Sequence, residues 1–345
     1  MSAFSTMAAR PRFSTVLPTL RDAFIPASTS IKQRLDLFRH SRAFLSTSPN
    51  RLDSYKPLKN RIPSSSWDSH MHVVEPRYPV ITDAAYEPTL HTIDDAIAFE
   101  SSLGIKNVVL VQPSIYGFDN SCLLDSLRRI GPSRGRGVVV IDPANIQTNT
   151  LRAWHFLGVR GVRVNFRSSG KVPTSDELEQ MLPEQARLIR PLGWMIQVHL
   201  PMSTIPLLEQ IIPQLGVKVC IDHFGAPDLH KGKRGQRCSF DPYTLPGFSS
   251  LIDLLKAGRT YVKISAPYRL SRDEGFQDLE IMIREFLREA PNRVLYATDW
   301  PHTRFSGVDI EPFTERCVHI CGSQALVERV FRLNAEELMD YTLDI

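Results

Sequence analysis

The chain has 345 residues, of which 42% are hydrophobic and 23% are charged, as is typical of a globular protein with a sizeable core. The formal net charge of +4 is uneven: residues 1–62 carry eleven Lys and Arg against three acids, or +8, which leaves −4 for the remainder. Such a body lacks the basic face that nucleic-acid binding needs, and no apolar run reaches the roughly 18 residues of a membrane span. We therefore expect neither a nucleic-acid partner nor a membrane protein.

The first 62 residues form a basic leader that is rich in Ser, Thr, Ala and Arg and has no acidic residue before Asp22. Residues 31–45 have the pattern of a basic amphipathic helix. This composition is typical of a mitochondrial transit peptide, and a tail without a targeting role in a cytoplasmic protein is the alternative. We predict a disordered leader over 1–62, a mitochondrial location and one folded domain over 63–345.

From Trp67 onward, short apolar runs alternate with amphipathic helical patterns. The predicted strands are 67–73, 107–111, 135–141, 161–165, 194–199, 217–222, 261–265 and 294–298. Several are continuous apolar runs, which is typical of strands that are buried on both faces of a parallel sheet. The predicted helices are 93–103, 121–130, 176–189, 203–215, 251–257, 276–289, 313–318, 323–331 and 335–341, and the expected N-caps of the first three are Thr92, Asn120 and Ser175.

Eight strands that alternate with helices predict the α/β class and a single (β/α)8 TIM-type barrel. A doubly wound open sheet is the alternative, but it would need a glycine-rich phosphate loop after the first strand, where this chain has Val73-Val74-Glu75-Pro76. In a barrel, active groups lie at the carboxyl ends of the strands. The ionisable residues of this chain fall at those ends.

Histidines and one aspartate are the candidate catalytic residues. His70 and His72 are two residues apart on the first strand, so their side chains point to the same face. His199 and His223 end the fifth and sixth strands, and Asp299 follows the eighth. Asp222 precedes His223, and the alternation of a strand predicts that it points outward in a structural role.

Arginines and hydroxyl groups at the same ends indicate an anionic substrate. Arg163 and Arg167 follow the fourth strand at an even spacing, and a guanidinium pairs with a carboxylate through two parallel hydrogen bonds. Ser114 and Tyr116, after the second strand, can donate to a carbonyl or carboxylate oxygen. The remaining candidates for substrate binding are Asn165 and His302, with Lys263 and Tyr268 at the seventh strand.

Several of these strand-end motifs resemble those of a known family. Trp67-Asp68-Ser69-His70-Met71-His72 is similar to the first-strand motif of the amidohydrolase superfamily. The later motifs resemble the branch that contains 2-pyrone-4,6-dicarboxylate lactonase and the sugar-lactone hydrolases; they lie at 111–117, 158–165, 197–199, 221–227 and 296–302. The resemblance covers about residues 65–340. It implies a barrel in which water attacks a carbonyl group.

The resemblance also implies roles for the candidate residues. Asp299 would be the general base that takes a proton from water, and His70, His72, His199 and His223 would hold or polarise the substrate. Members with two metals use a carboxylated Lys or a Glu at the end of the fourth strand, where this chain offers neither. The lactonase-like branch implies that no cofactor is required. One Zn²⁺ held by His70, His72, His199 and Asp299 is the alternative.

We therefore predict a hydrolase that opens a lactone of a small, carboxylated substrate with water activated by Asp299. The alternatives are a sugar-lactone (rhamnono- or fuconolactone) hydrolase, a Zn-dependent non-oxidative decarboxylase of an aromatic acid, and an inactive barrel that serves as a binding protein. The expected partner is a small anionic lactone or carboxylate. A homo-oligomer is compatible with the sequence.

Overall fold

The computed structural model describes residues 56–84, 86–167, 170–229 and 241–340. Most of the predicted leader lies outside these residues, so its disorder and its targeting role stay predictions. The described end of the leader contains a 3-10 turn at Leu58–Asn60. Leu58 and Ile62 are buried in the hydrophobic core. The folded domain therefore includes residues before the predicted boundary at 63.

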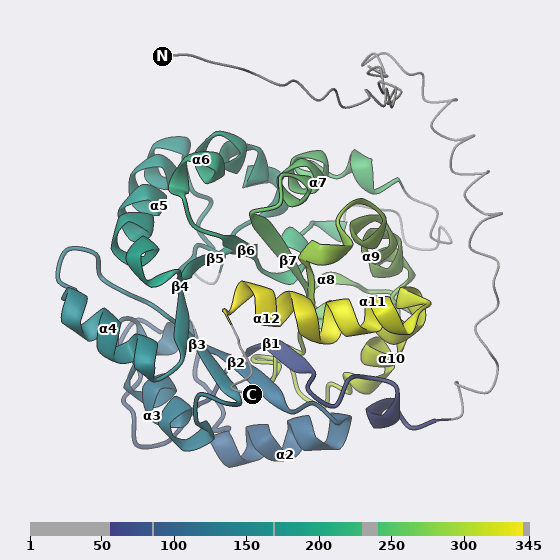
Figure 1. Cartoon of the computed structure of the whole chain (residues 1–345), viewed down its shortest axis with the longest axis horizontal. Coiled ribbons are helices and arrows are strands. Elements are labelled where there is room, and N and C mark those ends of the chain that lie inside the picture. The colour runs from purple at the N-terminus through teal and green to yellow at the C-terminus, as the bar shows by residue number, and fades with distance from the viewer. Residues whose placement is uncertain (1–55, 85, 168–169, 230–240, 341–345) are drawn as a thin grey trace, which may run out of the picture. The chain divides into compact units, whose positions relative to one another are not determined.

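Within the described ranges, eight parallel strands form one sheet in the order of the chain (Figure 1). They are β1 Trp67–Met71, β2 Asn107–Val111, β3 Gly135–Val139, β4 Val159–Asn165, β5 Met195–His199, β6 Val219–Ile221, β7 Thr260–Ile264 and β8 Val294–Tyr296. The backbone after β8 returns to β1, because Asp299 N donates to His70 O at 3.0 Å and His72 N donates to Trp300 O at 2.8 Å. These bonds link the last strand to the first, and the predicted barrel is confirmed.

Helices α2 to α9 connect consecutive strands around the outside of the barrel, and α10 to α12 follow the last strand. They are α2 Ile93–Leu103, α3 Ser121–Ile130, α4 Thr148–Phe156, α5 Ser175–Ile189, α6 Leu208–Leu215, α7 Phe248–Lys256, α8 Pro267–Leu270, α9 Gln277–Glu289, α10 Glu311–Cys321, α11 Gln324–Glu328 and α12 Asn334–Leu338. The sequence did not predict α4 or α8. Only Leu151 of α4 is buried, so the helix has almost no apolar stripe, and α8 is a single turn.

Of the three predicted N-caps, one forms a capping bond, one occupies the cap position without such a bond, and one is wrong. Thr92 caps α2 in a capping box with Asp95, as predicted. Asn120 precedes α3 but makes no capping bond, because its side chain pairs with both the N–H and the C=O of Val140 beyond β3. Ser175 is the first residue of α5, and the cap is Thr174, which forms a capping box with Glu177.

The amino-terminal end of the barrel is filled with apolar side chains. Inward-facing residues of the strands form one cluster with α12: Trp67, Val109, Val111, Val138, Met195, Cys220, Tyr261, Leu295, Ala335, Leu338 and Met339. Figure 1 shows α12 lying across this end of the strands. The candidate site residues lie at the opposite end, where the strands have their carboxyl ends.

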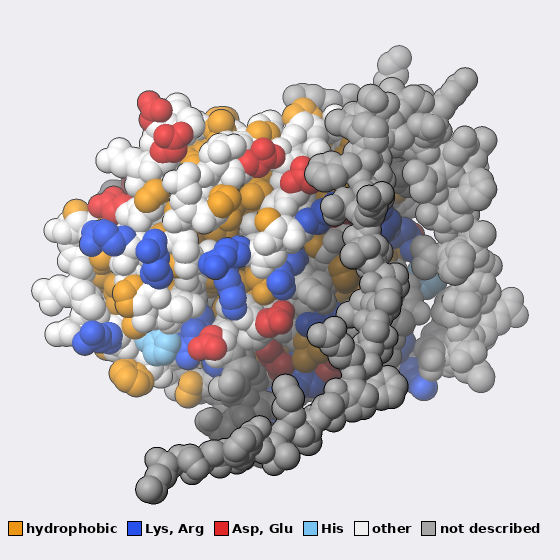
Figure 2. All heavy atoms as spheres, turned by 45° about the horizontal axis from the view of Figure 1, so that its top comes forward, with side chains coloured by type: hydrophobic (Ala, Val, Ile, Leu, Met, Phe, Trp, Pro, Cys, Tyr) orange, Lys and Arg blue, Asp and Glu red, His pale blue; other side chains and the backbone are white. Residues whose placement is uncertain are grey.

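On the outside, Figure 2 shows one face of the molecule with a band of Lys and Arg side chains that has acidic side chains on both sides of it. Such interspersed charges are typical of a solvated surface. In the described part of the chain, no helix is both long enough and apolar enough to cross a lipid bilayer.

Candidate active site

The Asp299 carboxylate is held in one orientation at the carboxyl end of β8. The backbone of Asp299 has a positive φ of 63° and is bonded to β1 through His70 O. Its Oδ2 accepts hydrogen bonds from the Tyr268 hydroxyl at 2.6 Å and from Arg269 Nε at 2.8 Å. Because Oδ2 is engaged in this way, Oδ1 is the oxygen that faces the interior of the site.

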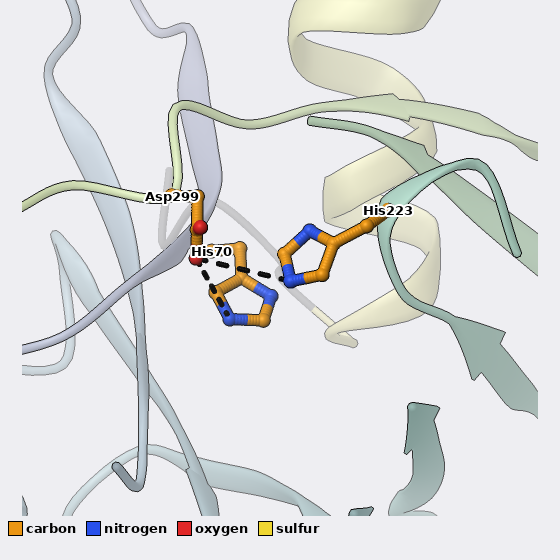
Figure 3. A group of neighbouring side chains, drawn as sticks. All are labelled: His70, His223 and Asp299. Atoms are coloured by element: carbon orange, nitrogen blue, oxygen red, sulfur yellow. Dashed lines mark ion pairs between the residues drawn. The ribbon is translucent and has the colours of Figure 1, made fainter. Parts of the chain in front are cut away.

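Three imidazoles surround that oxygen. The Nε2 atoms of His70, His72 and His223 lie 3.7, 3.8 and 3.8 Å from Asp299 Oδ1. Figure 3 shows the rings of His70, from β1, and His223, from the turn after β6, directed toward this oxygen. His199 lies next to them, with its ring centre 4.8 Å from that of His223. The structure therefore brings together the residues that were predicted to be catalytic.

In His72 and His223, the second ring nitrogen is fixed by a neighbouring group. His72 Nδ1 lies 2.7 Å from the carbonyl oxygen of Val111, and His223 Nδ1 lies 2.7 Å from Ser265 Oγ. A carbonyl oxygen can only accept, so His72 carries its proton on Nδ1, and in the neutral ring Nε2 presents a lone pair to the site.

A fully buried polar network lies beneath His70. Asp222 Oδ1 is 3.2 Å from His70 Nδ1 and 3.4 Å from Lys263 Nζ. Gln197 completes the network, because its Nε2 donates to Asp222 Oδ2 at 3.0 Å and its Oε1 accepts from Lys263 at 2.7 Å. This network fixes the ring of His70 from below.

The prediction that Asp222 points outward is wrong. Asp222 keeps the inward direction of Cys220, two residues earlier, which belongs to the apolar cluster inside the barrel. The strand alternation then fails at His223, because its positive φ of 49° starts a 3-10 turn at His223–Gly225. Both side chains therefore reach the site.

Burial and neighbouring charges set the ionisation of these groups. Burial lowers the pKa of His70, His199 and His223 below the usual 6.5, and burial together with the nearby Arg163 lowers the pKa of His72 to about 4. Burial alone would raise the pKa of Asp299, but His223 and Arg269 hold it well below 3.8. Near neutral pH the site therefore holds neutral imidazoles around an ionised carboxylate.

A cavity of about 200 Å³ opens above this carboxylate. Its lining includes His72, His199, His223 and Asp299, together with Tyr86, Ser114, Asn165, Arg163, Arg167, Arg269 and Arg304. Arg163 is almost buried; its Nη1 donates to Gln112 O, and its Nε has no partner among the described residues. The guanidinium groups give the wall of this cavity positive charge.

A family comparison agrees with this arrangement. Residues 67–340 match the amidohydrolase family model. This chain belongs to the amidohydrolase family. The amidohydrolase is 31% identical over 265 residues to 4-sulfomuconolactone hydrolase from Hydrogenophaga intermedia, a match that covers 74% of this chain and 81% of the relative. It is 29% identical to 2-pyrone-4,6-dicarboxylate hydrolase from Comamonas testosteroni, over 74% of this chain and 83% of that protein.

A solved structure is also similar to this amidohydrolase. The protein from Acinetobacter baumannii is described as a probable 2-pyrone-4,6-dicarboxylic acid hydrolase, and its crystal structure has citric acid bound. The TM-score is 0.67 at 25% identity, and the match covers 80% of this chain and all of the other. The two proteins therefore share the barrel along almost the whole folded domain.

Lys263, which is held in the buried network, and Tyr268, which donates to Asp299, lie outside the cavity lining of the amidohydrolase. Two further residues predicted to bind substrate also lie outside it. The Tyr116 hydroxyl lies against the backbone of Glu75, and Tyr116 lines a separate hollow. The ring of His302 packs between Tyr268 and Phe99, with centre distances of 5.1 and 5.9 Å. A direct role for these two side chains in binding stays a prediction without support from the cavity.

Several residues of the site were not predicted. Arg269 follows Tyr268, which the sequence did indicate, so its position next to a candidate was the available signal. Gln197 lay within a motif of the family resemblance, but no role was assigned to it. Tyr86 and Arg304 come from loops after β1 and β8 and reach the same cavity. No spacing in the sequence indicates that these loops approach each other.

The donor set of this amidohydrolase fits a divalent metal ion. Among the described residues, two groups have candidate ligand atoms within 4.8 Å of one another: His70, His223 and Asp299, and His199, Asp222 and His223. The buried Nε2 of His70 has no hydrogen-bond partner in the described structure, which suits a ligand atom. When bound there, Zn²⁺ would lower the pKa of a coordinated water. The four-residue zinc set drawn from the sequence stays a prediction.

Proposed function

We propose that this amidohydrolase hydrolyses a carboxylated lactone, with Asp299 as the general base. The observation that carries the proposal is the free Oδ1 of Asp299, which faces three imidazoles at the floor of an arginine-lined cavity. The names of the two relatives, which are hydrolases of 4-sulfomuconolactone and of 2-pyrone-4,6-dicarboxylate, support a lactone that carries an acidic group.

The arginines position the substrate in this proposal. A carboxylate of the lactone pairs with Arg163, whose Nε is unpaired among the described residues, and with Arg167 or Arg304 at the cavity wall. This contact holds the carbonyl carbon above Asp299. Substrate anions also offset the positive surroundings of Asp299, so its pKa rises in the complex and it becomes a stronger base.

The attacking water lies between Asp299 Oδ1 and His72 Nε2. Both atoms are acceptors, since the proton of His72 is on Nδ1, and a water molecule can donate one hydrogen to each. The water oxygen bonds to the carbonyl carbon while Asp299 takes a proton. His223 donates from Nε2 to the developing oxyanion when the Ser265 hydroxyl donates to its Nδ1.

Ring opening completes the reaction. The bond between the carbonyl carbon and the ring oxygen breaks, and Asp299 returns its proton to that oxygen. The product is a hydroxy acid whose new carboxylic acid ionises near neutral pH. One proton is therefore released to the solvent in each turnover.

The test is a panel of carboxylated lactones and sugar lactones assayed with a pH indicator, with and without a chelator. We expect Asp299→Asn to lower kcat by about 10²- to 10⁴-fold, the usual contribution of a general base. Asp253→Asn, at an exposed position on α7, is the matched control and should keep full activity. A folded Asp299→Asn variant with wild-type kcat would overturn the proposed mechanism, and turnover of none of the lactones would overturn the activity.

A further inference from the structure

A second hollow lies beside the catalytic cavity. Its volume is about 450 Å³. Its walls come from the segment between β1 and α2 and from the 3-10 turn after β2; the lining residues are Val74, Glu75, Pro76, Tyr78, Val80, Ala84, Tyr86, Glu87, Pro88, Leu90 and Tyr116. Nothing in the proposed reaction uses this space.

The two hollows share a wall. Tyr86 lines both of them. The 3-10 turn Ser114–Tyr116 contributes Ser114 to the catalytic cavity and Tyr116 to the second hollow. Tyr86 is therefore the side chain that a molecule would pass in reaching from the site of reaction to the second hollow.

The polarity of the two hollows is opposite. The catalytic cavity is lined by Arg163, Arg167, Arg269 and Arg304. Among the described residues that line the second hollow there is no Lys or Arg, and the acidic residues there are Glu75 and Glu87. An anionic group is therefore attracted to the first space and repelled from the second.

Two of the three tyrosines of the second hollow, Tyr78 and Tyr116, have their hydroxyl groups turned to the protein. The Tyr78 hydroxyl donates to Asp125, and the Tyr116 hydroxyl is paired with the backbone of Glu75. Arg77 lies between the lining residues Pro76 and Tyr78 in the sequence. Its guanidinium stacks on the ring of Tyr78 and pairs with Asp125. Besides Glu75 and Glu87, the lining that a ligand meets includes aromatic rings together with Val80 and Leu90, and this apolar part suits an uncharged apolar group.

The volumes of the two hollows also indicate that the second one holds a further part of the substrate. Small-molecule sites usually have roughly 300–1,000 Å³, and the catalytic cavity of about 200 Å³ lies below that range. A single lactone ring with its carboxylate would occupy most of it. The second hollow, at about 450 Å³, has room for a further ring or a short aliphatic chain.

We propose that the second hollow is a subsite for an uncharged aromatic or aliphatic substituent of the substrate. The carboxylated lactone ring lies among the arginines, and the substituent passes Tyr86 and packs against Tyr78, Val80 and Leu90. This inference rests on the proposed lactone hydrolysis and adds a substrate class to it. The preferred substrate carries its charge at one end and an apolar group at the other.

The test compares two probes: a 2-pyrone with one carboxylate and a phenyl substituent, and the same compound with a methyl group in place of phenyl. We expect wild-type kcat/KM to be about tenfold or more higher for the phenyl probe, since extra buried apolar groups give discrimination of that order. Leu90→Asp and Val80→Asp each place a charge on an exposed part of the lining. Each should reduce the preference to about threefold or less and leave kcat/KM for the methyl probe unchanged.

Phe156→Asp is the matched control, because Phe156 is an exposed apolar residue on α4 outside both linings; it should retain the full preference. Equal kcat/KM for the two probes in the wild type, or a preference that survives both Leu90→Asp and Val80→Asp, would overturn the subsite. If neither probe is hydrolysed, the proposed activity fails instead. In that case the Kd of each probe is measured by calorimetry. Tighter binding of the phenyl probe in the wild type, with a smaller difference in Leu90→Asp and Val80→Asp, supports the subsite, and equal Kd values for the two probes overturn it.

Discussion

The two ends of the barrel use the same strands for opposite purposes. Cys220 on β6 belongs to the apolar cluster, and Asp222, just after the end of β6, belongs to the polar network. On β7, Tyr261 and Lys263 are divided in the same way. All four side chains are almost or fully buried and face inward. Position along a strand therefore decides whether a buried residue serves packing or chemistry.

The energetic terms at the two ends differ accordingly. Apolar side chains at the amino-terminal end stabilise the fold by about 25 cal/mol per Å² of area removed from water. Buried charges at the carboxyl end cost desolvation energy, which their partners offset only when every member of the network is present. Substitutions at one end should change stability alone, and those at the other should affect activity or break a charge network.

The largest effect on stability is expected at the polar network. Lys263→Met leaves the buried Asp222 carboxylate without its closest cation, and breaking a buried pair in this way costs about 3–5 kcal/mol. Urea unfolding measures the loss. The double variant Lys263→Met and Asp222→Asn removes both charges and should recover most of it.

Lys256→Met is the control for this prediction. Lys256 pairs with Glu289 at 3.1 Å, but its side chain is half exposed, so the change should stay within about 1 kcal/mol. A Lys263→Met protein as stable as the wild type would show that the network does not depend on this charge. A double variant no more stable than the single one would show that packing, rather than charge, is lost.

The apolar end should lose stability without losing chemistry. Leu295 is fully buried in the cluster inside the barrel, and Leu295→Ala should lower the free energy of unfolding by about 2–5 kcal/mol. Below the unfolding transition, kcat/KM should stay within about twofold of the wild type, because Leu295 is four residues before Asp299 and outside the cavity lining. A parallel fall of kcat/KM in fully folded protein would contradict the separation of the two ends.

A smaller and purely kinetic effect is expected from Tyr268→Phe. The variant removes the hydroxyl that donates to Asp299 Oδ2 and leaves Arg269 on the same oxygen. A hydrogen bond to a charged group is worth about 1.5–3 kcal/mol, so kcat should fall about tenfold or more while KM changes little. Tyr243→Phe removes a similar bond to Glu285, far from the cavity, and should leave kcat unchanged. Equal kcat in the two variants would mean that Tyr268 does not orient the base.

This contrast also explains how much the sequence could reveal. The strands were predictable because they are short apolar runs between helices, and the barrel follows from their number and alternation. His70, His72, His223 and Asp299 were found because strand ends meet at one edge of a barrel. Their shared environment around Oδ1 depends on ring orientations, which backbone hydrogen bonds and Ser265 set and no motif encodes.

The remaining errors arise where a local rule is overridden. Alternation predicted that Asp222 points outward, but the chain turns at His223 with a positive φ. The Asn120 side chain can cap a helix, but here it forms hydrogen bonds with the backbone N–H and C=O of Val140 instead. Arg304 reaches the cavity from a loop, and the sequence does not specify which loops approach each other across the mouth.

Glu100 shows the same limit and supports the last of the predictions. It lies on α2, where the sequence gives only a helix, but the structure buries it against Asp68 at the start of β1. Burial, followed by the charge of Asp68, raises the pKa of Glu100 well above 4.5. The folded protein therefore binds this proton more tightly than the unfolded chain does, and stability falls as pH rises above the unfolded value toward the folded one.

Glu100→Gln keeps a hydrogen-bond donor toward Asp68 and removes this dependence. Urea unfolding should show little difference from the wild type near pH 4 and a more stable variant near pH 8, by about 1.4 kcal/mol for each unit of pKa shift between the two states. Glu285→Gln is the control, and its effect on stability should have the opposite sign. Burial raises the pKa of Glu285, but Arg288 and Tyr243 outweigh burial and lower it. The variant should therefore be less stable than the wild type at neutral pH, and this difference should disappear in acid. If the free energies of unfolding of Glu100→Gln and the wild type changed with pH in parallel, Glu100 would be ionised in the folded protein. The assignment of a neutral Glu100 carboxyl beside β1 would then be wrong.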